Sequence, residues 1–133
     1  MRAIKLKAPG GLNNLELVEI GTVEPQCGEI RVRIRASSLN FHDYVVAIGL
    51  RPVADGRIPM SDGAGIVEAV GPGVTRFQPG DRVMSCFFPY WANGRADSPA
   101  KLSGVPGDNV DGFAADQPLG RQFGPVAAQA RSA

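Results

Sequence analysis

The stretch that decides the fold runs from Gly71 to Val83 and reads GPGVTRFQPGDRV. It opens with Gly71-Pro72-Gly73, a tight-turn signal, because glycine tolerates the positive φ that such turns require and proline fixes its own φ. A second turn signal, Pro79-Gly80-Asp81, follows closely, and Arg82-Val83 then enters an apolar segment. Two turns this close together predict short strands rather than long helices.

Composition supports the same reading along the whole chain. The 133 residues include 17 glycines and 11 prolines, about a fifth of the chain against a usual share of roughly 12%. Hydrophobic residues make up 44% and charged residues 20%, which suits one domain with a packed core. The sequence therefore describes a globular chain that turns often.

Charge, cysteine content and the first residues exclude several classes of protein. Fourteen basic and thirteen acidic residues give a net charge of +1, whereas nucleic-acid-binding domains usually carry a basic excess. Two cysteines are too few for a disulfide scaffold. The chain begins without the apolar run of a signal peptide, and no segment is long and apolar enough to span a membrane. We expect a cytoplasmic protein that contacts neither nucleic acid nor membrane.

Hydrophobic patterning predicts mainly β structure. Alternation predicts strands over 2–7, 15–20 and 29–36, and β-rich runs predict further strands over 64–70 and 82–88, with another starting in 110–115. Apolar residues at 41, 45 and 48 predict a short helix over 41–48, which follows possible caps at 37–40 and is terminated by Gly49. Many strands and turns with one or two short helices indicate a partly open β-barrel. No core-forming period is visible over 116–133, so an irregular tail, disordered or truncated, is expected there.

Arg31, Arg33 and Arg35 form the only local basic cluster, and they alternate with Ile30, Val32, Ile34 and Ala36. The alternation favours the solvent-facing side of a half-buried strand. A phosphate-binding stripe is the alternative interpretation.

Three segments together resemble a known family. They are the Gly71–Val83 stretch, Pro25-Gln26-Cys27-Gly28-Glu29-Ile30-Arg31-Val32 and Asp62-Gly63-Ala64-Gly65-Ile66-Val67-Glu68. In order and spacing they resemble the N-terminal GroES-like catalytic domain of the medium-chain dehydrogenase/reductase superfamily, over residues 1–115. The resemblance is greatest to zinc-independent, NAD(P)-dependent alcohol dehydrogenases and quinone oxidoreductases. It implies an oxidoreductase acting on a small carbonyl, alcohol or quinone substrate.

The same resemblance bears on zinc. Zinc-binding members of the superfamily place a Cys just before the short helix and a His–Glu pair just before the Gly-Ala-Gly strand. Here the matching positions hold Asn40 and Ser61-Asp62, and neither Asn nor Ser is a usual zinc ligand. The four cysteines of the structural zinc lobe are also missing, so we expect no zinc.

By position in the family, three neighbouring residues are candidates for catalysis. Asn40 would face the substrate cleft as an amide donor. His42, the only histidine, lies where relatives carry a proton-relay residue, and it could act as a general acid. The alternative for His42 is a polar residue on an exposed helix turn. Asp43 matches a common acidic position, and capping of the helix N-terminus explains it equally well.

Aromatic residues are the candidates for the substrate pocket. Tyr44, Phe88 and Trp91 would supply an apolar wall with polar handles, although ordinary core or interdomain packing would also explain them. The run from Phe87 to Trp91 is dense in aromatic residues. If this run is exposed, it marks the surface for a missing partner.

The cofactor side of the enzyme is not visible in this sequence. The family resemblance implies NAD(P)H as cofactor, held by a separate Rossmann domain whose glycine-rich loop opens a helix. No such motif follows a strand here, so the Rossmann domain is expected to be absent from this chain. Two hypotheses follow: a truncated, non-autonomous substrate-side half of an oxidoreductase, inactive alone, or a stand-alone GroES-like binding or assembly module without catalysis. An incomplete barrel would also expose an edge that permits self-association.

Overall fold

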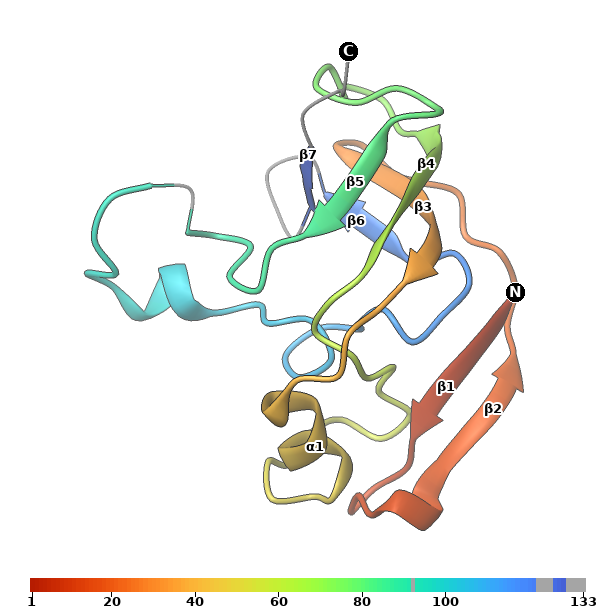
Figure 1. Ribbon diagram of the computed structural model, residues 1–133, viewed down its shortest axis with the longest axis vertical. Coiled ribbons are helices and arrows are strands. Elements are labelled where there is room, and N and C mark those ends of the chain that lie inside the picture. Colours follow the sequence, from red (N-terminus) through yellow and green to blue (C-terminus); the bar gives the residue numbers. More distant parts are fainter. Residues whose placement is uncertain (92, 122–125, 129–133) are drawn as a thin grey trace.

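The computed structural model describes residues 1–91, 93–121 and 126–128, and its strands form two antiparallel sheets (Figure 1). The smaller sheet pairs β1 (Arg2–Leu6) with β2 (Leu15–Glu19). The larger sheet has the strand order β6-β3-β4-β5-β7. Its strands are β3 (Glu29–Ala36), β4 (Ala64–Val70), β5 (Arg82–Ser85), β6 (Leu119–Arg121) and β7 (Val126–Ala128).

Strand β3 shows how alternation places one face in the core. Ile30 and Val32 are buried, whereas Arg33 and Arg35 are exposed, which confirms the prediction of a solvent-facing side. Arg31 is half-buried and pairs with Glu24 at 2.8 Å. Glu68 pairs with Arg33, so carboxylates, and not a phosphate, neutralise Arg31 and Arg33 in this structure.

Residues 114–118 join the two sheets into one curved wall. The carbonyl of Ala114 accepts a hydrogen bond from the amide of Ile4 on β1 at 2.8 Å. Two residues further on, the carbonyl of Asp116 accepts from Ile34 on β3 at 3.0 Å, and the carbonyl of Pro118 accepts from Val32 at 3.1 Å. This continuity between the sheets makes the partly open barrel that the sequence predicts.

The core has two parts, one that includes residues of the large sheet and one that includes Ala3 of the small sheet. The larger cluster consists of the buried side chains Ile30, Val32, Val67, Phe77 and Val83. The smaller cluster packs Ala3 against Ile58 and Ala115. Burying side chains of this size contributes about 1.5–3 kcal/mol each for the larger ones, so the sheet carries most of the apolar stabilisation.

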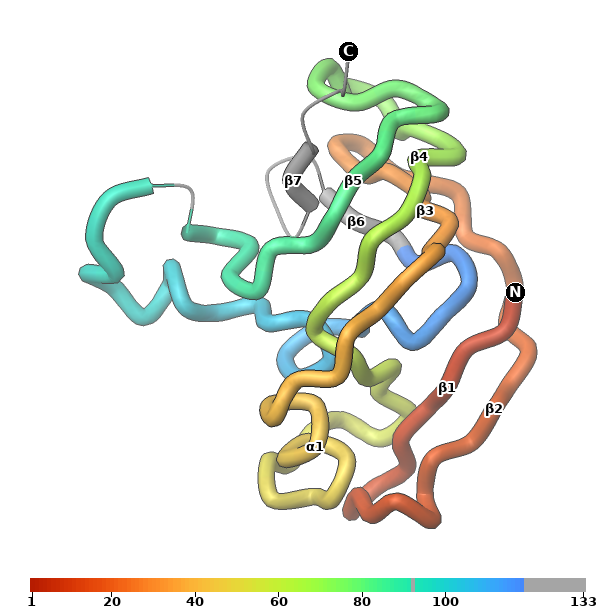
Figure 2. The backbone as a smooth tube through the Cα atoms, in the orientation of Figure 1, coloured from red at the N-terminus to blue at the C-terminus, as the bar shows by residue number. Residues whose placement is uncertain are grey.

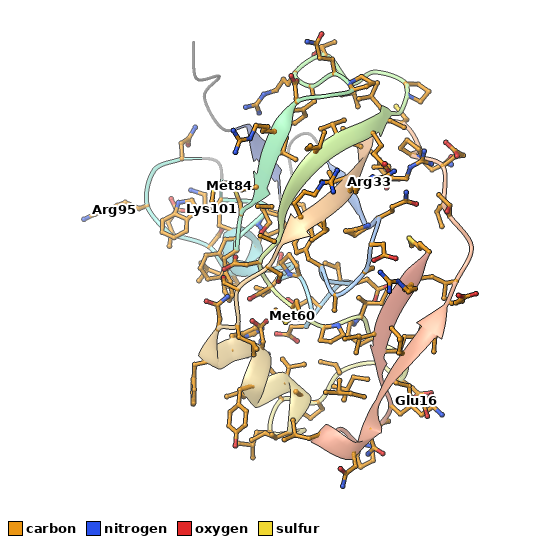
Figure 3. All side chains as sticks on the ribbon, turned by 45° about the vertical axis from the view of Figure 1, so that its right-hand side comes forward. Glu16, Arg33, Met60, Met84, Arg95 and Lys101 are labelled. Atoms are coloured by element: carbon orange, nitrogen blue, oxygen red, sulfur yellow. The ribbon has the colours of Figure 1, made fainter. Side chains whose placement is uncertain are left out.

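Helix α1 (Phe41–Ala47) lies at one end of the barrel, below the ends of β3 and β4 (Figure 1). Two short 3-10 helices complete the structure, η1 (Leu12–Asn14) and η2 (Pro99–Leu102). The tube in Figure 2 shows the segment after β5 leaving the barrel as a long excursion that contains η2 and then returning toward α1. Figure 3 shows Arg95 and Lys101 on this excursion, well away from Arg33 on the sheet.

The structure corrects three expectations from the sequence. Strand β5 ends at Ser85, because the apolar run continues into aromatic residues that leave the sheet. Residues 110–115 form only isolated bridges, such as Ala3 with Ala115, and no strand. Within 116–133, expected to be irregular, the described residues include β6 and β7 at opposite edges of the large sheet. Positions 122–125 and 129–133 of that segment lie outside the described residues.

Candidate active site

Asn40 precedes the first turn of α1 and binds the segment before β4. Its Nδ2 donates to Asp62 Oδ2 at 2.8 Å and to Ser61 Oγ at 3.2 Å. Ser38 Oγ also donates to Asp62 Oδ2, at 3.0 Å. Because an amide nitrogen has only two protons, both are already used. Asn40 could donate to a substrate oxygen only after one of these bonds had opened.

Hydrogen bonds within the fold fully explain why an aspartate stands at position 43. Its carboxylate accepts the backbone amide of Asn40 at 2.8 Å through Oδ2 and the backbone amide of Ser61 at 2.7 Å through Oδ1. The first bond caps the N-terminus of α1, as in a capping box, and the second fixes the helix to the chain before β4. Asp43 is 3% exposed, so the geometry favours the capping interpretation over contact with a substrate.

His42 lies in a half-buried position beside a second carboxylate. Its side chain is 19% exposed, and its Nε2 lies 3.8 Å from Oδ2 of Asp108, which is itself buried. The imidazole packs edge-on against Phe87 at a centroid distance of 5.2 Å. The alternative of an exposed helix turn is therefore wrong, because Phe87 and Asp108 lie against the imidazole.

The carboxylate of Asp108 is charged and enclosed. Removing a carboxylate from water costs several kcal/mol unless a cation or hydrogen bonds compensate. Arg51, which is half exposed, forms an ion pair with Asp108 Oδ2 through its Nε. Asn109 donates its Nδ2 to the other oxygen, Oδ1, at 3.3 Å. The pair formed by Arg51 and Asp108 thus lies directly behind the imidazole of His42.

Aromatic residues extend from the histidine toward the solvent. Phe87 contacts Phe88 edge-on at 4.8 Å, and Phe88 lies 6.0 Å from the ring of Trp91. Trp91 is 40% exposed. The structure thus brings two of the predicted pocket residues, Phe88 and Trp91, into one series of ring contacts that starts at His42.

Tyr44 does not join this series. It follows His42 by two helical positions, so its side chain leaves α1 on a nearly opposite side. The residue is 48% exposed, and its ring lies 6.2 Å from that of Phe41. Phe41 and Tyr44 therefore belong to another surface of the helix.

A shallow depression adjoins the Asn40 network. It has a volume of about 240 Å³ and is lined by Ala36, Ser37, Ser38, Asp62, Gly63, Ala64, Met84 and Ser85. Ser85 Oγ accepts the backbone amide of Gly63 at 2.9 Å on its floor. Asp62 belongs both to this depression and to the hydrogen bonds of Asn40, so a molecule bound in it would lie next to the N-terminus of α1.

Comparison with known proteins gives the family. Residues 26–120 match the family model described as the alcohol dehydrogenase GroES-like domain. The chain belongs to this family. A cobalt- and zinc-bound thermostable alcohol dehydrogenase from Pyrobaculum aerophilum is 32% identical, with a TM-score of 0.84 over 98% of this chain and 42% of that chain. A quinone oxidoreductase from Pseudomonas syringae is 28% identical, with a TM-score of 0.73 over 99% of this chain and 34% of that one.

Curated relatives include much larger proteins. A mycocerosic acid synthase-like polyketide synthase from Mycolicibacterium smegmatis is 48% identical over 80 residues, which are 59% of this chain and 4% of that protein. The GroES-like domain described here therefore spans a small part of these synthases and about two fifths of the solved alcohol dehydrogenase from Pyrobaculum. These neighbours place it in the medium-chain dehydrogenase/reductase superfamily.

The side chains of this GroES-like domain do not fit a catalytic zinc ion. Of Asn40, Ser61 and Asp62, only Asp62 offers a usual zinc ligand, and its Oδ2 accepts two hydrogen bonds. Over the described ranges, no three residues of the types His, Cys, Asp and Glu lie close enough together to hold a metal ion. Within the same ranges, no helix is long and apolar enough to cross a membrane.

Sequence reasoning missed the partners that define the histidine's surroundings. Asp108 is far from His42 in the sequence and Arg51 follows the end of its helix, and both lie in connections without a periodic pattern. Ser61 appeared only as a zinc position, although it is fully buried and bonded to both Asn40 and Asp43. The one available signal was a single charged residue, Asp108, within the turn Val105-Pro106-Gly107-Asp108.

Proposed function

We propose that this domain is the substrate-side wall of a zinc-independent, NAD(P)H-dependent oxidoreductase that acts on a carbonyl, alcohol or quinone compound. The observation that carries the proposal is the half-buried imidazole of His42, placed between the buried carboxylate of Asp108 and the aromatic residues that start at Phe87. A carbonyl oxygen that gains negative charge needs a proton or a hydrogen-bond donor. His42 is the group best placed to give that proton.

The hydrogen bonds around Asn40 support the zinc-independent part of the proposal. The Asn40 amide donates hydrogen bonds to the hydroxyl of Ser61 and to the carboxylate of Asp62. These are the three positions where zinc-binding relatives carry ligands. A metal ion would have to break these bonds and would gain one good ligand. We expect the purified domain, dialysed against zinc and then buffer, to retain well below one equivalent of zinc.

NAD(P)H does not fit the described part of this chain. Its phosphates require backbone amides of a glycine-rich loop at a helix N-terminus. Within the described ranges the one α-helix is α1, with seven residues, and Ser37-Ser38-Leu39-Asn40 precede it without a glycine. We therefore propose that another domain holds the cofactor and that this domain is inactive alone.

The polyketide synthase relatives favour a second candidate substrate. They are 43–48% identical to this domain over about 80 residues. Synthases of this kind handle acyl chains, and an unsaturated acyl chain carries a conjugated carbonyl of the same chemistry as an enone or a quinone. The second candidate is therefore an enoyl-reductase-like role on such an acyl chain.

A non-catalytic role is the alternative function. A stand-alone GroES-like module would bind or assemble through its surface, and Tyr90 and Trp91 are exposed on the excursion after β5. Self-association through a strand edge would use the outer edges of β6, β7 or β2, since β3 and β5 are already paired on both sides. For either role we propose a cytoplasmic location.

The experiment uses Trp91, the only tryptophan, as a reporter. A soluble benzoquinone titrated into the chain should quench its fluorescence saturably, and Phe88→Ala should weaken this apparent binding several-fold because Phe88 contacts Trp91. Tyr44→Ala is the matched control and should leave it unchanged. In a separate titration, NADPH fluorescence should not respond at micromolar domain concentrations. Saturable micromolar NADPH binding, or linear quinone quenching that Phe88→Ala does not alter, would contradict the proposal.

A further inference from the structure

The arrangement around His42 leaves its Nε2 without a hydrogen bond and facing Asp108 Oδ2, an oxygen that also pairs with the guanidinium of Arg51. His42 Nε2 and Asp108 Oδ2 are both enclosed from solvent, and they lie 3.8 Å apart. This separation exceeds a hydrogen bond by only about 1 Å. Buried polar groups are nearly always satisfied in native proteins. Asp108 Oδ2 is therefore the acceptor that the structure offers to Nε2.

We propose that Asp108 is a positioning residue that fixes the orientation and tautomer of His42, with the Nε2 proton directed at its carboxylate and Nδ1 left to exchange a proton with bound substrate. The orientation of the His42 ring by Asp108 is inferred from the geometry alone. Its catalytic consequence rests on the proposed function.

The chemistry of the pair determines which nitrogen carries the proton. A carboxylate is an acceptor only, so it opposes an imidazole that presents a lone pair and favours one that presents an N–H. Nε2 faces Asp108 and is enclosed, whereas the side chain as a whole is 19% exposed. A neutral ring with its proton on Nε2 has Nδ1 as its basic atom, and Nδ1 does not face the carboxylate.

The loop that carries Asp108 holds the carboxylate firmly. The amides of Asp108 and Asn109 both donate to the carbonyl of Val105, at 3.3 and 3.0 Å. Asn109 Nδ2 donates a hydrogen bond to Asp108 Oδ1, and Asn109 Oδ1 accepts one from the backbone amide of Val105 at 3.3 Å. One oxygen is therefore taken by the loop itself, and Oδ2 remains for His42 and Arg51.

Charged groups reach the imidazole from three elements. Asp108 comes from the 105–110 loop and Arg51 from the connection after α1. Asp43 is its neighbour on α1, but both of its oxygens accept backbone amides. Phe87, on the remaining side, is uncharged. Among these groups, Asp108 is the acceptor that faces Nε2.

The test is nitrogen-15 NMR of the full 133-residue chain, where His42 is the only histidine and gives unambiguous ring signals. In the neutral form, the shifts should show the proton on Nε2. Asp108→Asn should mix the two tautomers, because it removes the carboxylate that accepts the Nε2 proton. Arg51→Gln should preserve the Nε2–H tautomer, because it leaves that carboxylate in place.

Two results would overturn the inference: a neutral ring protonated on Nδ1 in the unsubstituted chain, or a tautomer that Asp108→Asn does not alter. If Asp108→Asn fails to fold, the tautomer of the unsubstituted chain still decides the matter. Neither readout requires turnover. A failure of quinone binding would therefore refute the proposed function, whereas the NMR result alone decides whether Asp108 orients His42.

Discussion

Replacing Asp43 by asparagine tests whether this carboxylate is structural. Its two oxygens accept backbone amides at 2.8 and 2.7 Å in a site that is 3% exposed. A hydrogen bond to a charged group contributes about 1.5–3 kcal/mol. Asparagine removes the charge from both bonds and turns an N–H toward one of the two amides. We therefore expect Asp43→Asn to lower the free energy of unfolding by about 3–5 kcal/mol, out of a total of about 5–15 kcal/mol.

Urea unfolding followed by circular dichroism measures this loss. Asp55→Asn is the matched control, because Asp55 accepts one backbone amide, that of Ala8 at 2.8 Å, at an exposed position. The control should change the free energy of unfolding by less than about 1 kcal/mol. If Asp43→Asn were as mild as the control, the capping explanation would fail, and the catalytic interpretation of Asp43 would become the better one.

Two further outcomes follow from the fold. Gly71→Ala should destabilise the domain by about 1–3 kcal/mol in thermal unfolding, because its Cβ would lie 1.9 Å from the carbonyl oxygen of Gln26. In the control Gly21→Ala, the new Cβ meets no atom within 4 Å, so this variant should be neutral or slightly stabilising. Equal effects of the two substitutions would argue against the close approach at Gly71. The Arg2 guanidinium hydrogen bonds to Asp116 and holds the pKa of that carboxyl below its usual value. The pair therefore stabilises the fold above about pH 4 and loses its effect as the pH falls through the lowered pKa. The difference in stability between the unsubstituted chain and Arg2→Ala should shrink on acidification and in high salt. A difference that grew on acidification would contradict this reasoning.

Local patterns were sufficient for the elements that build most of the barrel. The alternation over 29–36 and the β-rich run over 64–70 coincide with β3 and β4. In these strands one face is buried and the other meets solvent or charge pairs, so the period of two is strong. The helix predicted from apolar residues at 41, 45 and 48 is α1 with its end one residue earlier.

The rest depended on contacts between distant parts of the chain. Strands β6 and β7 have three residues each, too few for a period to be recognised. The aromatic residues after Ser85 are as apolar as a strand, and only the packing of Phe87 against His42 explains why they leave the sheet. The candidate site shows the same division: the family position pointed to His42, but nothing near it in sequence pointed to Asp108 or Arg51.

The strand order has a consequence for how the protein emerges from the ribosome. Residues 119–128 supply the outermost strand on each side of the large sheet, so β3 and β5 both have open flanks until synthesis has passed that point. A nascent chain that already contains its core would expose two unpaired backbone ladders at once, which is a hazard for aggregation. The barrel therefore cannot be completed before β6 and β7 have been synthesised, and these two strands protect both sides of the sheet.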